Sequence, residues 1–180
     1  MPMPRPLVTD VAPPAGSRVV GFYPSTDLCD AYSIELPDDA CGDPEALARF
    51  VLARSPAWMN VLMGIRDTLV AGLGLKTAHG LRELGADDGE RVGIFRIYER
   101  RPAELLLGED DKHLDFRLSV LCQPPAAAGD KRRLIVSTVV HCHNALGRGY
   151  LAVVAPFHRR ILRASLANAA RIGWPPQPAR

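Results

Sequence analysis

The chain has 180 residues, 47% of them hydrophobic and 23% charged, which is the composition of an ordinary globular protein. Its formal net charge is only +2, and the 19 arginines and three lysines form no basic run, so a nucleic-acid surface is not favoured. No apolar stretch approaches the roughly 20 residues of a membrane span, and prolines and charges stand where a signal peptide would be apolar. We therefore expect a cytoplasmic protein that binds neither nucleic acid nor a membrane.

The cysteines show no C-x-x-C spacing, so a zinc knuckle or a redox pair is not predicted. Buried free thiols are the default in a reducing compartment. We expect this state for Cys29, Cys41, Cys122 and Cys142, and we expect no metal and no cofactor.

The N-terminal region is rich in proline. Residues 1–17 carry five prolines and few apolar anchors, which is typical of a disordered or loosely attached tail. We expect a single domain over residues 18–173, followed by a second tail at residues 174–180.

The first elements of the domain are one strand and two short helices. Residues 28–36 alternate as a strand does, although Asp30 weakens the pattern. Asp43 is a good N-cap before Pro44, which predicts a helix to about residue 54. The same start signal at Ser55 predicts a second helix over residues 56–71.

The middle of the chain has a β pattern with regularly spaced turn signals. The pattern predicts an antiparallel meander. Its strands are expected at residues 92–99, 103–107, 112–123 and 133–143, with a less well-defined strand near Leu81.

A long amphipathic helix is predicted from Tyr150 to Ile172. Its apolar residues recur at steps of three and four, and the stripe places Phe157 in the core. Pro156 predicts a kink, and Gly147 and Gly149 predict a hinge before the helix. Gly173, with two prolines after it, ends the helix.

These elements predict an α+β fold of the helix-grip type. A curved antiparallel sheet would wrap around the long C-terminal helix, with two short helices near the N-terminus.

Three stretches resemble an uncharacterised bacterial family, domain of unknown function 2867. They are residues 56–76 (PAWMNVLMGIRDTLVAGLGLK), 107–117 (LGEDDKHLDFR) and 138–158 (TVVHCHNALGRGYLAVVAPFH). That family is similar to the START-like, or polyketide-cyclase-like, superfamily. The resemblance implies a cavity for apolar ligands between a curved sheet and a C-terminal helix, and it brings no catalytic residues.

Strand alternation predicts how the last two strands pair. A register in which paired residue numbers sum to 256 sets the apolar faces together. It places His113 opposite His143 and Asp115 opposite His141.

This register gathers His113, Asp115, Arg117, His141 and His143 on one face, where they could bind an anion or transfer a proton. If the apolar face grips the helix, this polar face is the solvated convex face and needs no ligand. The spacing does not support a metal site. Further polar or aromatic candidates in apolar surroundings are Trp58, Arg66 and Tyr150.

The sequence favours a non-catalytic domain that binds an apolar or amphipathic small molecule. One alternative is a cyclase- or hydrolase-like enzyme that uses the histidines and Asp115. The other is a protein-association module with a filled core. The sequence does not determine the ligand, the pathway or the oligomeric state.

Overall fold

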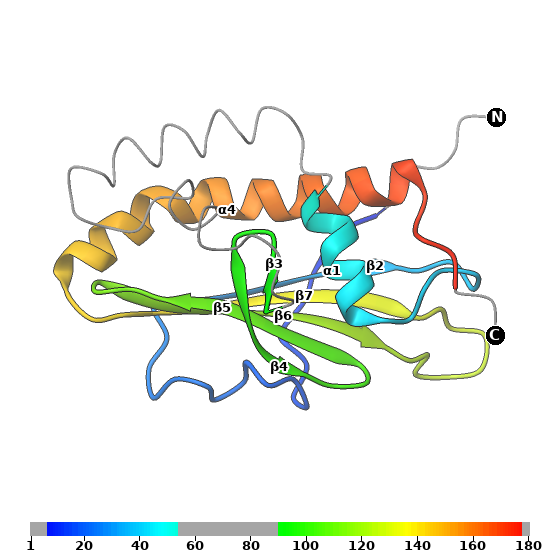
Figure 1. Cartoon of the computed structure of the whole chain (residues 1–180), viewed down its shortest axis with the longest axis horizontal. Helices are drawn as coiled ribbons and strands as arrows, with labels where there is room; N and C mark the ends of the chain where they lie inside the picture. The colour runs from blue at the N-terminus through cyan, green and yellow to red at the C-terminus, as the bar shows by residue number, and fades with distance from the viewer. Residues whose placement is uncertain (1–6, 54–89, 178–180) are drawn as a thin grey trace.

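The structure is a computed structural model, and it describes residues 7–53 and 90–177 (Figure 1). The predicted helix at 56–71, the strand near Leu81, and the candidates Trp58 and Arg66 lie outside the described residues.

Within the described residues, seven antiparallel strands form one open, curved sheet in the order β1-β2-β7-β6-β5-β4-β3. Their bounds are Thr9–Asp10 (β1), Leu28–Glu35 (β2), Arg91–Val92 (β3), Phe95–Arg100 (β4), Glu104–Asp110 (β5), Leu114–Gln123 (β6) and Arg133–Cys142 (β7). The predicted meander is confirmed as β4 to β7. Because β7 pairs with β6 along one edge and with β2 along the other, the first predicted strand lies beside the last.

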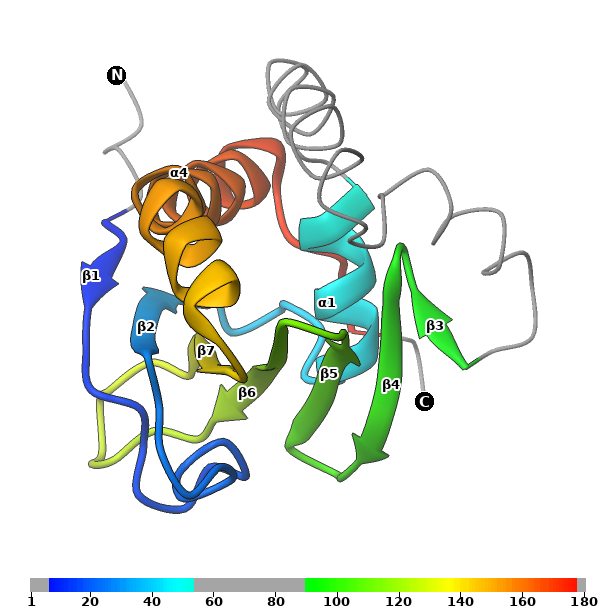
Figure 2. The same ribbon diagram turned by 90° about the vertical axis from the view of Figure 1, so that its left-hand side faces the viewer.

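The molecule has three layers (Figures 1 and 2). Helices α1 (Pro44–Ala53) and α4 (Ala145–Ile172) cover one face of the sheet. Residues 11–27, which we call the strap, run across the opposite face, where Val19 is buried against Leu106 and Val139. The strap therefore covers part of the face that the helices leave open.

Helix α1 begins as the sequence predicts. The carboxylate of Asp43 accepts hydrogen bonds from the backbone N–H groups of Glu45 and Ala46, which are otherwise unpaired at a helix start. The helix buries Leu47 and Val51 in the main core.

Helix α4 begins five residues earlier than predicted. Asn144 is its N-cap, and the Asn144 side chain accepts a hydrogen bond from Gly147 N at 3.0 Å. Gly147 and Gly149 therefore lie inside the helix and do not form a hinge before it. A side chain on Gly147 would collide with the backbone carbonyl of His113, so this glycine permits the close approach of helix and sheet.

The buried face of α4 is centred on one side of the predicted stripe. The large apolar residues that it buries are Leu151, Leu162 and Leu166, while Phe157 is 43% exposed. The placement of Phe157 in the core is wrong. Figure 1 shows that the first part of α4 is bent away from the axis of the rest, and Pro156 lies inside the helix. A bend shifts the inward face, so a straight-helix period misplaces the residues beside it.

Both predicted tails are partly folded. Thr9 and Asp10 pair with β2, and Ser17 is 5% exposed, so residues 7–17 belong to the fold. At the other end, Trp174 packs against Phe50, and Pro176 forms a β-bridge with Ala40. Proline content misled the prediction because these contacts are made with distant parts of the chain.

Candidate functional site

The predicted register of β6 and β7 is confirmed. Asp115 pairs with His141, and His143 N donates a hydrogen bond to His113 O at 2.9 Å just beyond the paired residues. The apolar face of the two strands packs toward α4. His141, His143 and Asp115 consequently lie on the face turned away from the helices.

The carboxylate of Asp115 forms an ion pair with the diagonal histidine rather than the directly opposite one. Its Oδ2 lies 3.0 Å from Nε2 of His143, whose side chain is 37% exposed. The other oxygen accepts a hydrogen bond from the backbone N–H of Asp111. Such a pair can hold or pass a proton at the open end of the sheet.

His141 is held by the strap. Its Nδ1 lies 2.9 Å from the backbone carbonyl of Ser25, which requires a proton on Nδ1. The ring of Tyr23 stacks on the imidazole, and the ring of His143 meets it edge-on. The strap thus fixes the orientation of the His141 ring through Tyr23 and Ser25, two residues of the predicted domain to which the sequence assigned no element.

His113 contacts the start of α4. Its Nδ1 lies 3.0 Å from the side-chain nitrogen of Asn144, the N-cap residue. His113 therefore supports the junction of sheet and helix. Among the described residues there is no group of three or more His, Cys, Asp or Glu side chains placed to hold a metal ion.

Arg117 is not on a solvated face. It is 5% exposed, and its Nη1 donates hydrogen bonds to Asp110 and to the Phe116 carbonyl. The guanidinium lies 3.7 Å from the ring centre of Tyr98 and 4.8 Å from that of Phe22. The prediction of a solvated outer face is wrong here because the strap covers it.

A buried carboxylate fixes the strap beside Arg117. Oε1 of Glu104 accepts hydrogen bonds from Ser17 Oγ at 2.6 Å and from Ser119 Oγ at 2.5 Å. The backbone N–H of Arg18 donates to the same carboxylate. Glu104 is 4% exposed, so these donors take the place of water.

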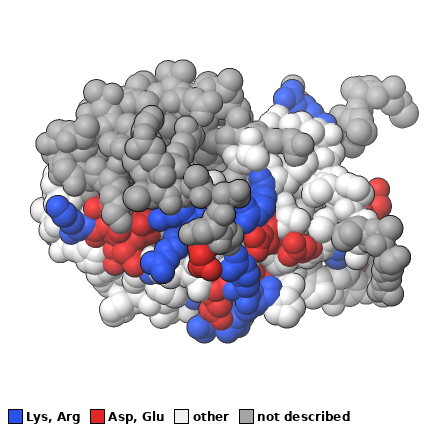
Figure 3. Space-filling model, viewed as in Figure 1, with Lys and Arg blue, Asp and Glu red and all other residues white. Residues whose placement is uncertain are grey.

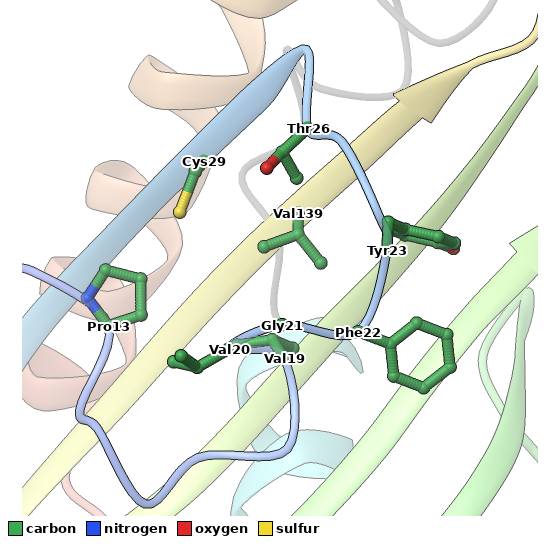
Figure 4. Close-up of a pocket in the computed structure, with 9 residues that line it drawn as sticks. All are labelled: Pro13, Val19, Val20, Gly21, Phe22, Tyr23, Thr26, Cys29 and Val139. Carbon is green, nitrogen blue, oxygen red and sulfur yellow. The ribbon is translucent and has the colours of Figure 1, made fainter.

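A small pocket of about 260 Å³ lies between the strap and the sheet (Figure 4). None of the three histidines lines this pocket. Its lining is mainly apolar and consists of Pro13, Val19, Val20, Gly21, Phe22, Tyr23, Thr26, Cys29 and Val139. Cys29 is exposed, contrary to expectation, while Cys41, Cys122 and Cys142 are buried free thiols. Burial raises the pKa of the Cys142 thiol to about 11, so it is a poor nucleophile.

Charged side chains of both signs lie next to one another on the face shown in Figure 3. Among the described ion pairs, Arg91 contacts Glu109 at 3.1 Å, Glu45 pairs with Arg100, and Glu99 pairs with Arg101. Neighbouring charges of opposite sign largely cancel at a distance.

A second set of polar groups lies between the sheet and α4. The apolar contacts of this layer form two separate clusters, one around Leu28, Val140 and Leu151 and the other around Tyr32, Val136 and Leu162. Asp30 stands between Leu28 and Tyr32 on the inward face of β2, and Thr138 stands between Val136 and Val140 on that of β7. Asp30 and Thr138 are direct cross-strand partners.

His158 of α4 faces the same position. Its Nε2 lies 3.4 Å from Oδ1 of Asp30, and Nε of Arg159 lies 3.9 Å from Oδ2. We call Asp30, Thr138 and His158 the polar layer. It crosses the interface between sheet and helix where the apolar core is interrupted.

The atoms of the polar layer are buried without hydrogen-bond partners. Both carboxylate oxygens of Asp30, Thr138 Oγ1 and His158 Nε2 are screened from solvent, and none makes a hydrogen bond within the part of the chain that the structure describes. Thr138 is 3% exposed, and the Asp30 side chain is 11% exposed. Buried polar groups are almost always paired, so such a cluster needs an explanation.

Sequence reasoning missed this layer although the sequence contains a signal for it. Asp30 interrupts an inward-facing series of apolar residues in a strand, and we took it only as a weakness of that strand. Tyr150, by contrast, was selected as a candidate, and it lies half-buried in the second turn of α4, outside this layer.

A comparison with protein families matches residues 22–165 to a family described as "Protein of unknown function (DUF2867)". The chain belongs to this family. The DUF2867 match covers β2 to β7, α1 and most of α4, so both polar sets lie inside it. Searches of curated proteins and of solved structures found no match. Within the described residues, no helix is long and apolar enough to cross a membrane.

Proposed function

We propose that this DUF2867 domain binds an apolar or amphipathic small molecule between the sheet and α4, as START-like helix-grip domains do. The order of the described elements supports the proposal. Strands β1 and β2 and helix α1 precede the meander, and one long helix follows it against the concave side of the curved sheet. The family relationship alone names no ligand, so the argument rests on the site.

The observation that carries the proposal is the polar layer. Ligand sites combine an apolar lining with a few polar groups that fix the orientation of the ligand. Asp30, Thr138 and His158 supply polar atoms without partners, and the flanking clusters supply the apolar lining. A bound molecule would satisfy these atoms, and its apolar part would lie against the two apolar clusters.

The polar layer is better placed for this role than the histidine face. Asp115 and His143 already form a pair with each other, and His141 and His113 have hydrogen-bonding partners. Their requirements are met without a ligand, whereas those of Asp30 are not.

Native mass spectrometry of the purified full chain tests the proposal. We expect the native protein to have a larger mass than the denatured chain, because the ligand stays bound. Thr138→Phe should abolish this difference in mass, because the larger side chain fills the polar layer. Val139→Phe serves as the matched control, because the neighbouring side chain faces the strap. The proposal would be contradicted if the native wild-type protein had only the mass of the chain, both as purified and after incubation with extracts of small molecules.

A further inference from the structure

We infer that the ligand of the polar layer is a neutral molecule with a hydroxyl group on an apolar body. The inference rests on the proposed function and adds the chemical class of the ligand. It follows from which atoms of the layer lack partners and from the charges around them.

The unpaired atoms first require a hydrogen-bond donor. A carboxylate accepts hydrogen bonds and cannot donate them, and both oxygens of Asp30 lack a donor. His158 and Arg159 lie within 4.0 Å of these oxygens, but neither side chain donates a hydrogen bond to them. The ligand must therefore present an O–H or N–H group to Asp30.

The charges around Asp30 then favour a neutral ligand group over an ionic one. The negative charge of Asp30 already has the guanidinium of Arg159 at 3.9 Å. An ammonium group would add an unmatched positive charge to a layer with little solvent, and a carboxylate would meet Asp30 with like charge. Neither ion matches the site as well as a neutral donor does.

A hydroxyl group also matches the other two members of the layer. It donates one hydrogen bond and accepts up to two. Directed at Asp30, it leaves its lone pairs for Thr138 Oγ1, the cross-strand neighbour, and for an N–H of His158. A single hydroxyl could thus serve all three side chains.

The remaining surroundings fit an apolar body. Along the strands the layer is flanked on one side by Leu28 and Val140 and on the other by Tyr32 and Val136, all at most 8% exposed. A molecule with many polar groups would leave most of them unpaired there.

Three probes of equal chain length test the inference: octan-1-ol, octanoate and octylammonium. Each is titrated into the isotope-labelled full chain, and the amide signals of Asp30 and Thr138 are followed by NMR. We expect octan-1-ol to bind at least about tenfold more tightly than either ion, because octanoate meets Asp30 with like charge and octylammonium adds a second positive charge beside Arg159.

The variant Asp30→Asn probes the charge argument. It keeps the size of the side chain and removes the repulsion, so octanoate should then bind nearly as tightly as octan-1-ol. Glu35→Gln is the matched control, because this carboxylate is exposed at the end of the same strand, and its preference should equal that of the wild type.

The outcomes separate the inference from the proposed function. Tighter binding of octylammonium or octanoate, or equal binding of all three probes, would overturn the neutral hydroxyl while leaving a small-molecule site. If no probe moves the signals of Asp30 and Thr138, the site itself is refuted. Octan-1-ol preferred over both ions by the wild type and by Glu35→Gln, with the preference over octanoate lost in Asp30→Asn, establishes the inference.

Discussion

Ser17 and Glu104 are joined by a hydrogen bond of 2.6 Å between side chains 87 positions apart in the chain. Neither is more than 5% exposed. This contact fixes the strap to the sheet and places the aromatic rings of Phe22 and Tyr23 around Arg117. The second face of the sheet is therefore partly covered by a segment that its own composition does not mark as structured.

Ser17→Ala should lower the free energy of unfolding by about 1.5–3 kcal/mol, the range for a buried hydrogen bond to a charged group. Thr26→Ala, an exposed residue of the same strap, should change it by less than about 0.5 kcal/mol. Urea denaturation followed by circular dichroism measures both. Equal and negligible effects would mean that the strap is not fixed at Ser17.

The strap also explains an expected response to alkaline pH. Burial, followed by the hydrogen bond to Asp110, raises the pKa of Tyr98 to about 12. A raised pKa of this kind favours the neutral phenol in the folded state. The stability from Tyr98 is therefore complete below its unfolded pKa of about 10 and is lost as the pH rises through 12.

Ultraviolet absorbance of tyrosinate between pH 9 and pH 13 tests this response. Tyr98→Phe should remove a phenol that ionises near pH 12 and should flatten the loss of stability above pH 10. If Tyr98→Phe instead removes a phenol that ionises near pH 10, Tyr98 is not buried as the structure shows.

Two glycines in α4 differ in their surroundings and allow a controlled comparison. A methyl group on Gly147 would meet the backbone carbonyl of His113, whereas nothing lies within 4 Å of the same position on Gly149. Gly147→Ala should therefore destabilise the domain by about 1–3 kcal/mol, as forced overpacking does. Gly149→Ala should stabilise it by roughly 0.5–1 kcal/mol through helix propensity.

Thermal melting of both glycine variants gives the comparison. If Gly147→Ala melts at or above the wild-type temperature, the close approach of α4 to His113 is wrong.

The sequence predicted the sheet better than the surroundings of the sheet. Alternation identified β4 to β7, and the pairing of Asp115 with His141 followed from matching apolar faces. That information is local or depends on two neighbouring strands. The hydrogen bond of Ser17 to Glu104 depends on residues brought together only by the complete fold, so no local pattern reveals it.

The candidate site shows the same limit. The sequence pointed to His113, His141 and His143 because of their side-chain type, yet all three have partners in the structure. Asp30 and His158 lie 128 positions apart, and their proximity depends on where the bent helix α4 crosses β2. A single polar residue in an apolar strand was the only local sign of the layer.

The inward face of α4 can be tested directly. Leu166 is fully buried, and Leu166→Ala should cost about 2–5 kcal/mol. Phe157→Ala should cost less than about 1 kcal/mol, because the ring is 43% exposed. Chemical denaturation of the two variants in parallel would contradict this packing if Phe157→Ala were the more damaging.

The free energy of unfolding of Asp30→Leu, measured in urea on protein freed of any ligand, tests the account most directly. If the polar layer exists to bind a ligand, an apolar side chain should leave this free energy unchanged or raise it by about 1–4 kcal/mol, because a buried charge without hydrogen bonds is replaced. The same variant should lose binding of octan-1-ol. A loss of about 3–5 kcal/mol would instead identify Asp30 and His158 as a structural ion pair and would contradict the account.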